Sequence, residues 1–111
     1  MTDTNNDNRP IPIDLVPYAE MLGGSREFLR AWAKPEGATS YFVNPRSLGA
    51  DPALFGIALV DAARHAAAAW GKALDRPEHE MLARIWEGLE AERTAPTSDL
   101  PLPVAVARKD D

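Results

Sequence analysis

Two hydrophobic patterns with helical spacing occupy the second half of the chain. In residues 51–74, apolar side chains recur on one stripe at about 100° per residue, and the stripe comprises Phe55, Leu59, Ala62, Ala66, Trp70 and Ala73. Asp51 suits the N-cap position and Pro52 the first helical position. The pattern therefore predicts a long helix over residues 51–74. Ile57, Val60 and Ala67 fall outside the stripe, so a second side of this helix also needs cover.

A second helix is predicted over residues 77–93. Its apolar stripe comprises Leu82, Ile85, Trp86 and Leu89. Asp75 and Glu78 have the spacing of a capping box, which predicts that Asp75 caps this helix. Gly88 lowers the helix propensity and suggests close packing at that position.

Alternation with a period of two precedes the helices and predicts a β-hairpin over residues 26–44. In Pro35-Glu36-Gly37 the proline suits a type I turn, and the glycine suits the left-handed position that closes a three-residue loop. Counting outward from this loop pairs Leu29 with Val43 and Trp32 with Ser40.

This register divides the side chains between two faces. One face carries Leu29, Ala31, Ala33, Thr39, Tyr41 and Val43, and it is expected to lie against the long helix. The other face carries Phe28, Arg30, Trp32, Lys34, Ser40, Phe42 and Asn44. The order of elements predicts an α+β fold of ββαα type, a two-stranded antiparallel hairpin followed by two helices.

The ends of the chain differ in composition from the middle. Residues 1–17 are predicted to form a flexible or extended arm, because residues 1–9 are polar and residues 10–17 alternate proline with branched apolar residues. Residues 18–94 form the single predicted domain. Residues 95–111 are proline-rich and are predicted to be a flexible tail, in which residues 103–107 are apolar enough to dock as an alternative.

Composition restricts the possible functions. The absence of cysteine excludes disulfides, thiolate catalysis and cysteine-based metal sites. The formal net charge of −5 disfavours binding to a phosphate backbone through bulk charge. The beginning of the sequence lacks the pattern of a signal peptide, and charged residues interrupt the most apolar run, so a cytoplasmic protein without a membrane segment is expected.

Several short motifs together resemble a family of bacterial proteins, domain of unknown function 5076. They are Leu29-Arg30-Ala31-Trp32-Ala33, Pro35-Glu36-Gly37, Asp51-Pro52-Ala53, Gly56-Ile57-Ala58-Leu59-Val60-Asp61 and Ala63-Arg64-His65-Ala66. The similarity extends over residues 26–93. It implies a hairpin followed by two helices, and it implies no activity, cofactor or catalytic residue.

Asp61, Arg64 and His65 form the most site-like cluster, because residues three and four apart share one side of a helix. One interpretation is structural: Asp61 and Arg64 tie the helix to the hairpin or to the second helix, and His65 borders the core. The alternatives are contacts to a ligand or partner, or an acid–base pair in a minor enzyme. No catalytic, cofactor-binding or metal-binding residues are assigned, because the sequence offers neither a nucleophile motif nor enough metal ligands.

The hairpin face with Phe28, Arg30, Trp32 and Phe42 mixes rings and positive charge. Such a mixture is found in platforms for single-stranded nucleic acid, although the acidic net charge weakens that hypothesis. Trp and Arg are also enriched at protein interfaces. We therefore expect a non-catalytic interaction or assembly module without a cofactor. It would form a homodimer through hairpin edges or through this aromatic face, with a further protein partner also possible.

Overall fold

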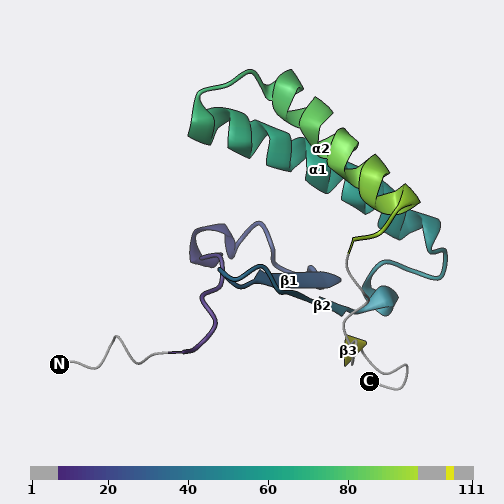
Figure 1. The fold of residues 1–111 in the computed structure, drawn as a ribbon. Helices are drawn as coiled ribbons and strands as arrows, with labels where there is room; N and C mark the ends of the chain where they lie inside the picture. The colour runs from purple at the N-terminus through teal and green to yellow at the C-terminus, as the bar shows by residue number, and fades with distance from the viewer. Residues whose placement is uncertain (1–7, 98–104, 107–111) are drawn as a thin grey trace.

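A computed structural model describes residues 8–97 and 105–106 of the chain (Figure 1). Strands β1 (Leu29–Ala33) and β2 (Thr39–Val43) precede helices α1 (Ala53–Leu74) and α2 (Glu78–Thr94). Two short 3-10 helices, η2 (Val16–Tyr18) and η3 (Pro45–Ser47), lie before β1 and after β2. The predicted α+β fold with ββαα order is confirmed.

The hairpin has the predicted register. Leu29 pairs with Val43 and Trp32 with Ser40 in the antiparallel ladder. The N–H of Lys34 donates to the Ala38 carbonyl at 2.8 Å, and Gly37 has a φ of 103°. Since only glycine adopts this φ without steric cost, the loop sequence determines the turn, and the turn determines the register.

A third strand joins the sheet where a flexible tail was predicted. β3 (Ala105–Val106) runs parallel to β2 and pairs with Phe42 and Val43. The prediction for the tail therefore differs from the structure at these two residues, as the docking alternative allowed. The predictions for residues 1–7, 98–104 and 107–111 lie outside the described residues.

Local capping explains where α1 begins and ends. The Asp51 Oδ1 atom accepts a hydrogen bond from the Ala53 N–H at 3.0 Å, as predicted. At the other end, Asp75 takes a left-handed conformation (φ 55°) and the Arg76 N–H donates to the Gly71 carbonyl at 2.9 Å. This bond pattern is a Schellman motif. The prediction that Asp75 caps α2 was wrong, because the residue terminates α1 instead.

Small residues form the contact between the two helices. Ala63, Ala67 and Gly71 are the buried residues of α1, and α2 packs beside α1 along its length (Figure 1). A Cβ atom on Gly71 would lie 2.9 Å from the Arg76 carbonyl oxygen and 3.3 Å from the Glu78 Cα atom. The close packing thus occurs at Gly71. The expectation for Gly88 was wrong, since a Cβ there would meet nothing within 4 Å.

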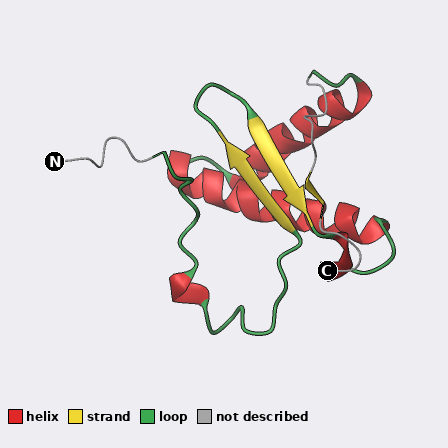
Figure 2. Ribbon diagram, turned by 90° about the horizontal axis from the view of Figure 1, so that it is seen from below, coloured by secondary structure: helices red, strands yellow, loops and turns green. Residues whose placement is uncertain are grey.

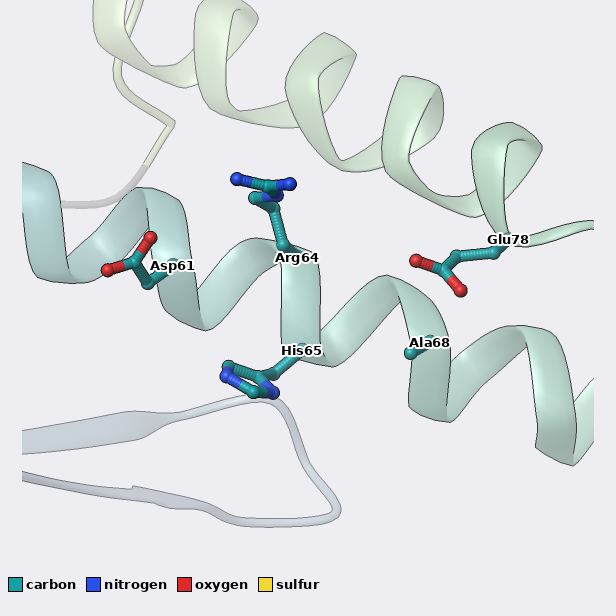
Figure 3. A pocket seen from close by; sticks show the side chains of 5 residues that line it. All are labelled: Asp61, Arg64, His65, Ala68 and Glu78. Atoms are coloured by element: carbon teal, nitrogen blue, oxygen red, sulfur yellow. The ribbon is translucent and has the colours of Figure 1, made fainter.

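The long helix lies between α2 and the hairpin, but its predicted stripe is only partly covered (Figures 1 and 3). At one end, the Phe55 and Phe28 rings meet edge to face, with centroids 6.1 Å apart. Further along the stripe, Leu59 is 37% exposed and Trp70 is 53% exposed. Among the described residues, no large side chain is fully buried. The stripe therefore contacts the hairpin near Phe55. The ring that it meets there is Phe28, which was predicted on the face directed away from the long helix. Tyr41, on the face predicted to pack on the helix, is 47% exposed, so the predicted orientation of the hairpin is not confirmed.

The segment before β1 leaves the body of the molecule. Figure 2 shows it looping away from the sheet and the helices before it returns to β1. The Asp14 Oδ1 atom accepts from the Val16 N–H at 3.0 Å, and the Tyr18 N–H donates to the Leu15 carbonyl at 2.9 Å. Local hydrogen bonds therefore shape this segment. In the described part of the chain, no helix has the length and apolar character needed to cross a membrane.

A substitution at Gly71 tests the importance of the helix contact. Gly71→Ala should lower the free energy of unfolding by about 1–3 kcal/mol, because backbone atoms of Arg76 and Glu78 would have to move. Gly88→Ala is the matched control and should raise it by about 0.5–1 kcal/mol through helix propensity. Denaturant unfolding measures both, and equal effects of the two substitutions would contradict this account.

Candidate functional site

The predicted polar cluster lines a concavity on one side of α1. Asp61, Arg64, His65 and Ala68 line it from α1, and Glu78 lines it from the first turn of α2. Its volume is about 370 Å³. The spacing of the α1 residues places them on neighbouring turns, and the short connection between the helices brings Glu78 beside them. Glu78 was not among the predicted site residues, because its position depends on how the two helices pack.

The polar groups in this concavity do not converge on one point. Figure 3 shows the Arg64 guanidinium directed toward α2 and the His65 ring directed toward the hairpin. The Asp61 carboxylate lies one turn before them, and the Glu78 carboxylate extends over α1 near Ala68. Such a divergent arrangement can contact a broad partner surface more readily than it can surround one small reacting group.

None of these four polar side chains forms a hydrogen bond or an ion pair within the described part of the chain. All four residues are also exposed. No bond in the described residues therefore supports the structural interpretation, in which Asp61 and Arg64 tie α1 to another element. Because the four residues are exposed, a ligand or a second protein can reach their donors and acceptors.

The charges in the concavity determine what it could bind. Arg64 can donate a forked pair of hydrogen bonds to a carboxylate, but Asp61 and Glu78 oppose a second negative charge nearby. In residues 8–97 and 105–106, no three histidine, aspartate or glutamate side chains gather in a possible metal site.

The aromatic and basic residues of the hairpin do not form one continuous surface. Phe28 is half-buried against Phe55, and Trp32 is also half-buried. Phe42 is 45% exposed. The Arg30 Nε atom donates to Glu27 Oε2 at 3.0 Å, and a second bond joins the same two side chains. The charge of Arg30 is thus offset locally, which weakens the case for a nucleic-acid platform.

This ion pair changes the acidity of Glu27. The hydrogen bond from Arg30 lowers the pKa of Glu27, partial desolvation opposes this effect, and the positive charge of Arg30 adds to it. The hydrogen bond and the charge of Glu27 raise the pKa of Arg30 in return. Both side chains are more than half exposed, so the pair contributes little to stability.

A second concavity, of about 350 Å³, was not predicted from the sequence. It is mainly apolar and is lined by Val43, Pro45, Leu48, Gly49, Ala50, Asp51, Pro52 and Phe55. It forms because η3 turns the chain between β2 and α1. The Asn44 Oδ1 atom accepts from the Arg46 N–H at 3.2 Å at the start of this turn. The Asn-Pro pair was a local signal for the turn, but the concavity also requires the position of Phe55 on α1.

Substitutions in the polar cluster test whether it supports the fold. Asp61→Ala and His65→Ala should each change the free energy of unfolding by less than about 0.5 kcal/mol, because both residues are exposed and their side chains form no bond to any described residue. Chemical denaturation provides the measurement. A loss several times larger would show that the cluster is structural.

The Glu27–Arg30 pair predicts a response to pH. Because the pKa of Glu27 is lowered in the folded chain, its small contribution to stability is present at neutral pH and is lost as the pH falls through that pKa. Titration of the Glu27 carboxyl group by NMR should give a higher pKa in Arg30→Ala than in the unsubstituted protein. Identical titration curves would contradict the assignment.

Comparison with known proteins gives a family and a structural relative. The model of the family described as "Domain of unknown function (DUF5076)" matches residues 13–97. A solved structure from the photosynthetic bacterium Rhodopseudomonas palustrus CGA009, described as a "putative pyruvate dehydrogenase", is similar with a TM-score of 0.62. The two sequences are 34% identical, and the alignment covers 86% of this chain and 95% of that one. No curated protein matches.

The family match includes the hairpin, both helices and the connection that forms the apolar concavity. It also begins within the arm that precedes η2, which the resemblance from short motifs had not reached. With more than half of the sequence matched, the chain belongs to the family of domain of unknown function 5076.

Proposed function

We propose that this protein is a non-catalytic assembly module that works as a homodimer. The observation that supports this most directly is the exposure of aromatic rings on both faces of the sheet. Tyr41 is 47% exposed and Phe42 is 45% exposed. Successive residues of a strand point to opposite faces, so the Tyr41 and Phe42 rings lie on opposite faces of the sheet. A single layer of helices can cover only one of these faces.

The partly covered stripe of α1 supports the same proposal. Leu59 and Trp70 lie on the side of α1 that was expected to pack on the hairpin, and both remain substantially exposed. Monomeric proteins rarely expose apolar surface over several neighbouring elements. A second copy of the chain would cover such surface, and a stable dimer buries about 800 Å² per partner.

A second candidate function is the binding of a small carboxylate at the polar concavity. The exposed Arg64 side chain, which forms no ion pair in the described part of the chain, favours it. The description of the structural relative makes pyruvate a sensible probe. This candidate ranks second because Asp61 and Glu78 line the same concavity. Saturable NMR shifts at Arg64 and His65, abolished in Arg64→Ala, would support it, and unchanged spectra would exclude pyruvate as the ligand.

Sedimentation experiments test the leading proposal. The protein should sediment as a dimer at tens of micromolar. This expectation assumes a dissociation constant of about 1 μM, which corresponds to a binding free energy of about 8 kcal/mol. Phe42→Ala and Trp70→Ala should each raise the dissociation constant by about tenfold or more, because each removes an exposed ring from the proposed interface.

Glu87→Ala is the matched control, since Glu87 lies on α2 and, among the described residues, pairs only with Arg84 at the surface. It should leave the dissociation constant unchanged. Circular dichroism of every variant establishes that the helices persist. A monomer throughout this concentration range would rule out the proposed homodimer.

A further inference from the structure

The outer edge of β1 has unpaired backbone groups. The sheet order β1-β2-β3 places β1 at one end. The Asn44 N–H donates to the Phe28 carbonyl at 2.9 Å, and the Lys34 N–H donates to the Ala38 carbonyl at 2.8 Å. In an antiparallel ladder these bonds recur at every second residue. Even-numbered residues of β1 therefore face β2, and the N–H and C=O groups of Leu29, Ala31 and Ala33 face outward.

No other described segment covers this edge. The Leu29, Ala31 and Ala33 N–H groups donate to no acceptor in residues 8–97 and 105–106. An edge of this kind readily accepts a further strand, because each added bond satisfies a donor or acceptor that otherwise needs water.

The segment before η2 has the sequence of such a strand. Pro10-Ile11-Pro12-Ile13 places its two isoleucines two residues apart, so their N–H groups point to the same side of an extended chain. The prolines lack N–H groups and fall on the opposite side, where a terminal strand needs no partner. The segment can therefore pair along one edge and would block further pairing along the other.

The same segment lacks an apolar environment within its own chain. Ile11 is 90% exposed and Ile13 is 83% exposed. The turn that follows, with Asp14 bound to the Val16 N–H, directs the segment away from the sheet and the helices (Figure 2). The chain thus exposes two large apolar side chains to solvent, and its sheet also has an unpaired strand edge.

We propose that residues 10–13 of one copy add as an edge strand to β1 of a second copy. Ile11 and Ile13 would pair with the outward groups of β1, whose spacing of two residues matches theirs. The inference rests on the proposed homodimer and assigns one of its interfaces. It accounts for both the free edge and the exposed isoleucines, whereas pairing of β1 with a second β1 accounts only for the edge.

Hydrogen exchange in the full-length dimer tests the pairing. The Leu29, Ala31 and Ala33 amides should exchange slowly in the unsubstituted protein and at least about tenfold faster in Ile11→Pro/Ile13→Pro. The prolines remove both donors and clash with the neighbouring strand. Ile11→Val/Ile13→Val retains the donors and is the matched control, and the Arg30 and Trp32 amides, which face β2, should not change in either variant.

Mixed dimers test whether the strand comes from the second copy. Because the chain contains no cysteine, Asn8→Cys provides a single position for a nitroxide label. This labelled chain, at natural isotope abundance, is mixed with ¹⁵N-labelled chains that carry no nitroxide. The nitroxide should broaden the Leu29, Ala31 and Ala33 signals of the ¹⁵N-labelled partner.

The possible outcomes separate this inference from the proposed function. A monomeric unsubstituted protein in sedimentation would remove the basis for both. A dimer whose odd-numbered β1 amides exchange rapidly, or remain protected in the double-proline variant, would overturn the strand addition alone. A further sample contains a chain that carries both ¹⁵N and the nitroxide, diluted in unlabelled protein. Broadening that appears only in this sample would place the strand in the same copy and would also overturn the proposed addition to a second copy.

Discussion

The close approach of α2 to α1 is the contact on which the rest of the structure depends. It requires small residues, because Gly71 leaves no room for a Cβ atom beside the backbone of Arg76 and Glu78. Ala63 and Ala67 continue the same side of α1. Small side chains allow close packing but bury little apolar area, whereas a fully buried leucine or phenylalanine contributes about 1.5–3 kcal/mol. The helix pair is therefore well positioned but buries only a small core.

This constraint affects the hairpin as well. Phe28 and Phe55 join the start of β1 to the start of α1, and the Ser47 hydroxyl donates to the Glu27 carbonyl at 3.0 Å beside them. Toward the other end of α1, Trp70 remains half exposed. The single chain thus has a closed end near Phe55 and an open end near Trp70. A two-stranded hairpin is only marginally stable in water by itself, and β3 adds only two residues to it. Association therefore offers a physical explanation for the exposed rings.

Local chemistry made part of this structure predictable. The Pro35-Glu36-Gly37 loop determined the register, because a glycine with positive φ fixes the turn. Asp51 fixed the start of α1 through its own side chain. Asp75 showed the limit of such reasoning, since aspartate suits both an N-cap and a left-handed C-terminal position. In the structure Asp75 takes the left-handed position, where its N–H donates to the Gly71 carbonyl.

The candidate site was predictable to a smaller extent. Helical spacing brought Asp61, Arg64 and His65 together, but it could not add Glu78 or show that the four polar groups diverge. The apolar concavity required the relative position of β2 and α1, which no local pattern contains. The sequence also did not predict that the hairpin buries only part of the apolar stripe of α1. Periodicity shows that one side of a helix is apolar, but it does not show how much of that side a neighbouring element buries.

Because one copy of the chain leaves much of its apolar surface exposed, we propose that folding and association are coupled. The most direct measurement is the free energy of unfolding at protein concentrations that differ a hundredfold. Coupled folding predicts that the apparent stability rises by about 2.7 kcal/mol at the higher concentration, through mass action. An unfolding transition that is independent of protein concentration would contradict coupled folding and association.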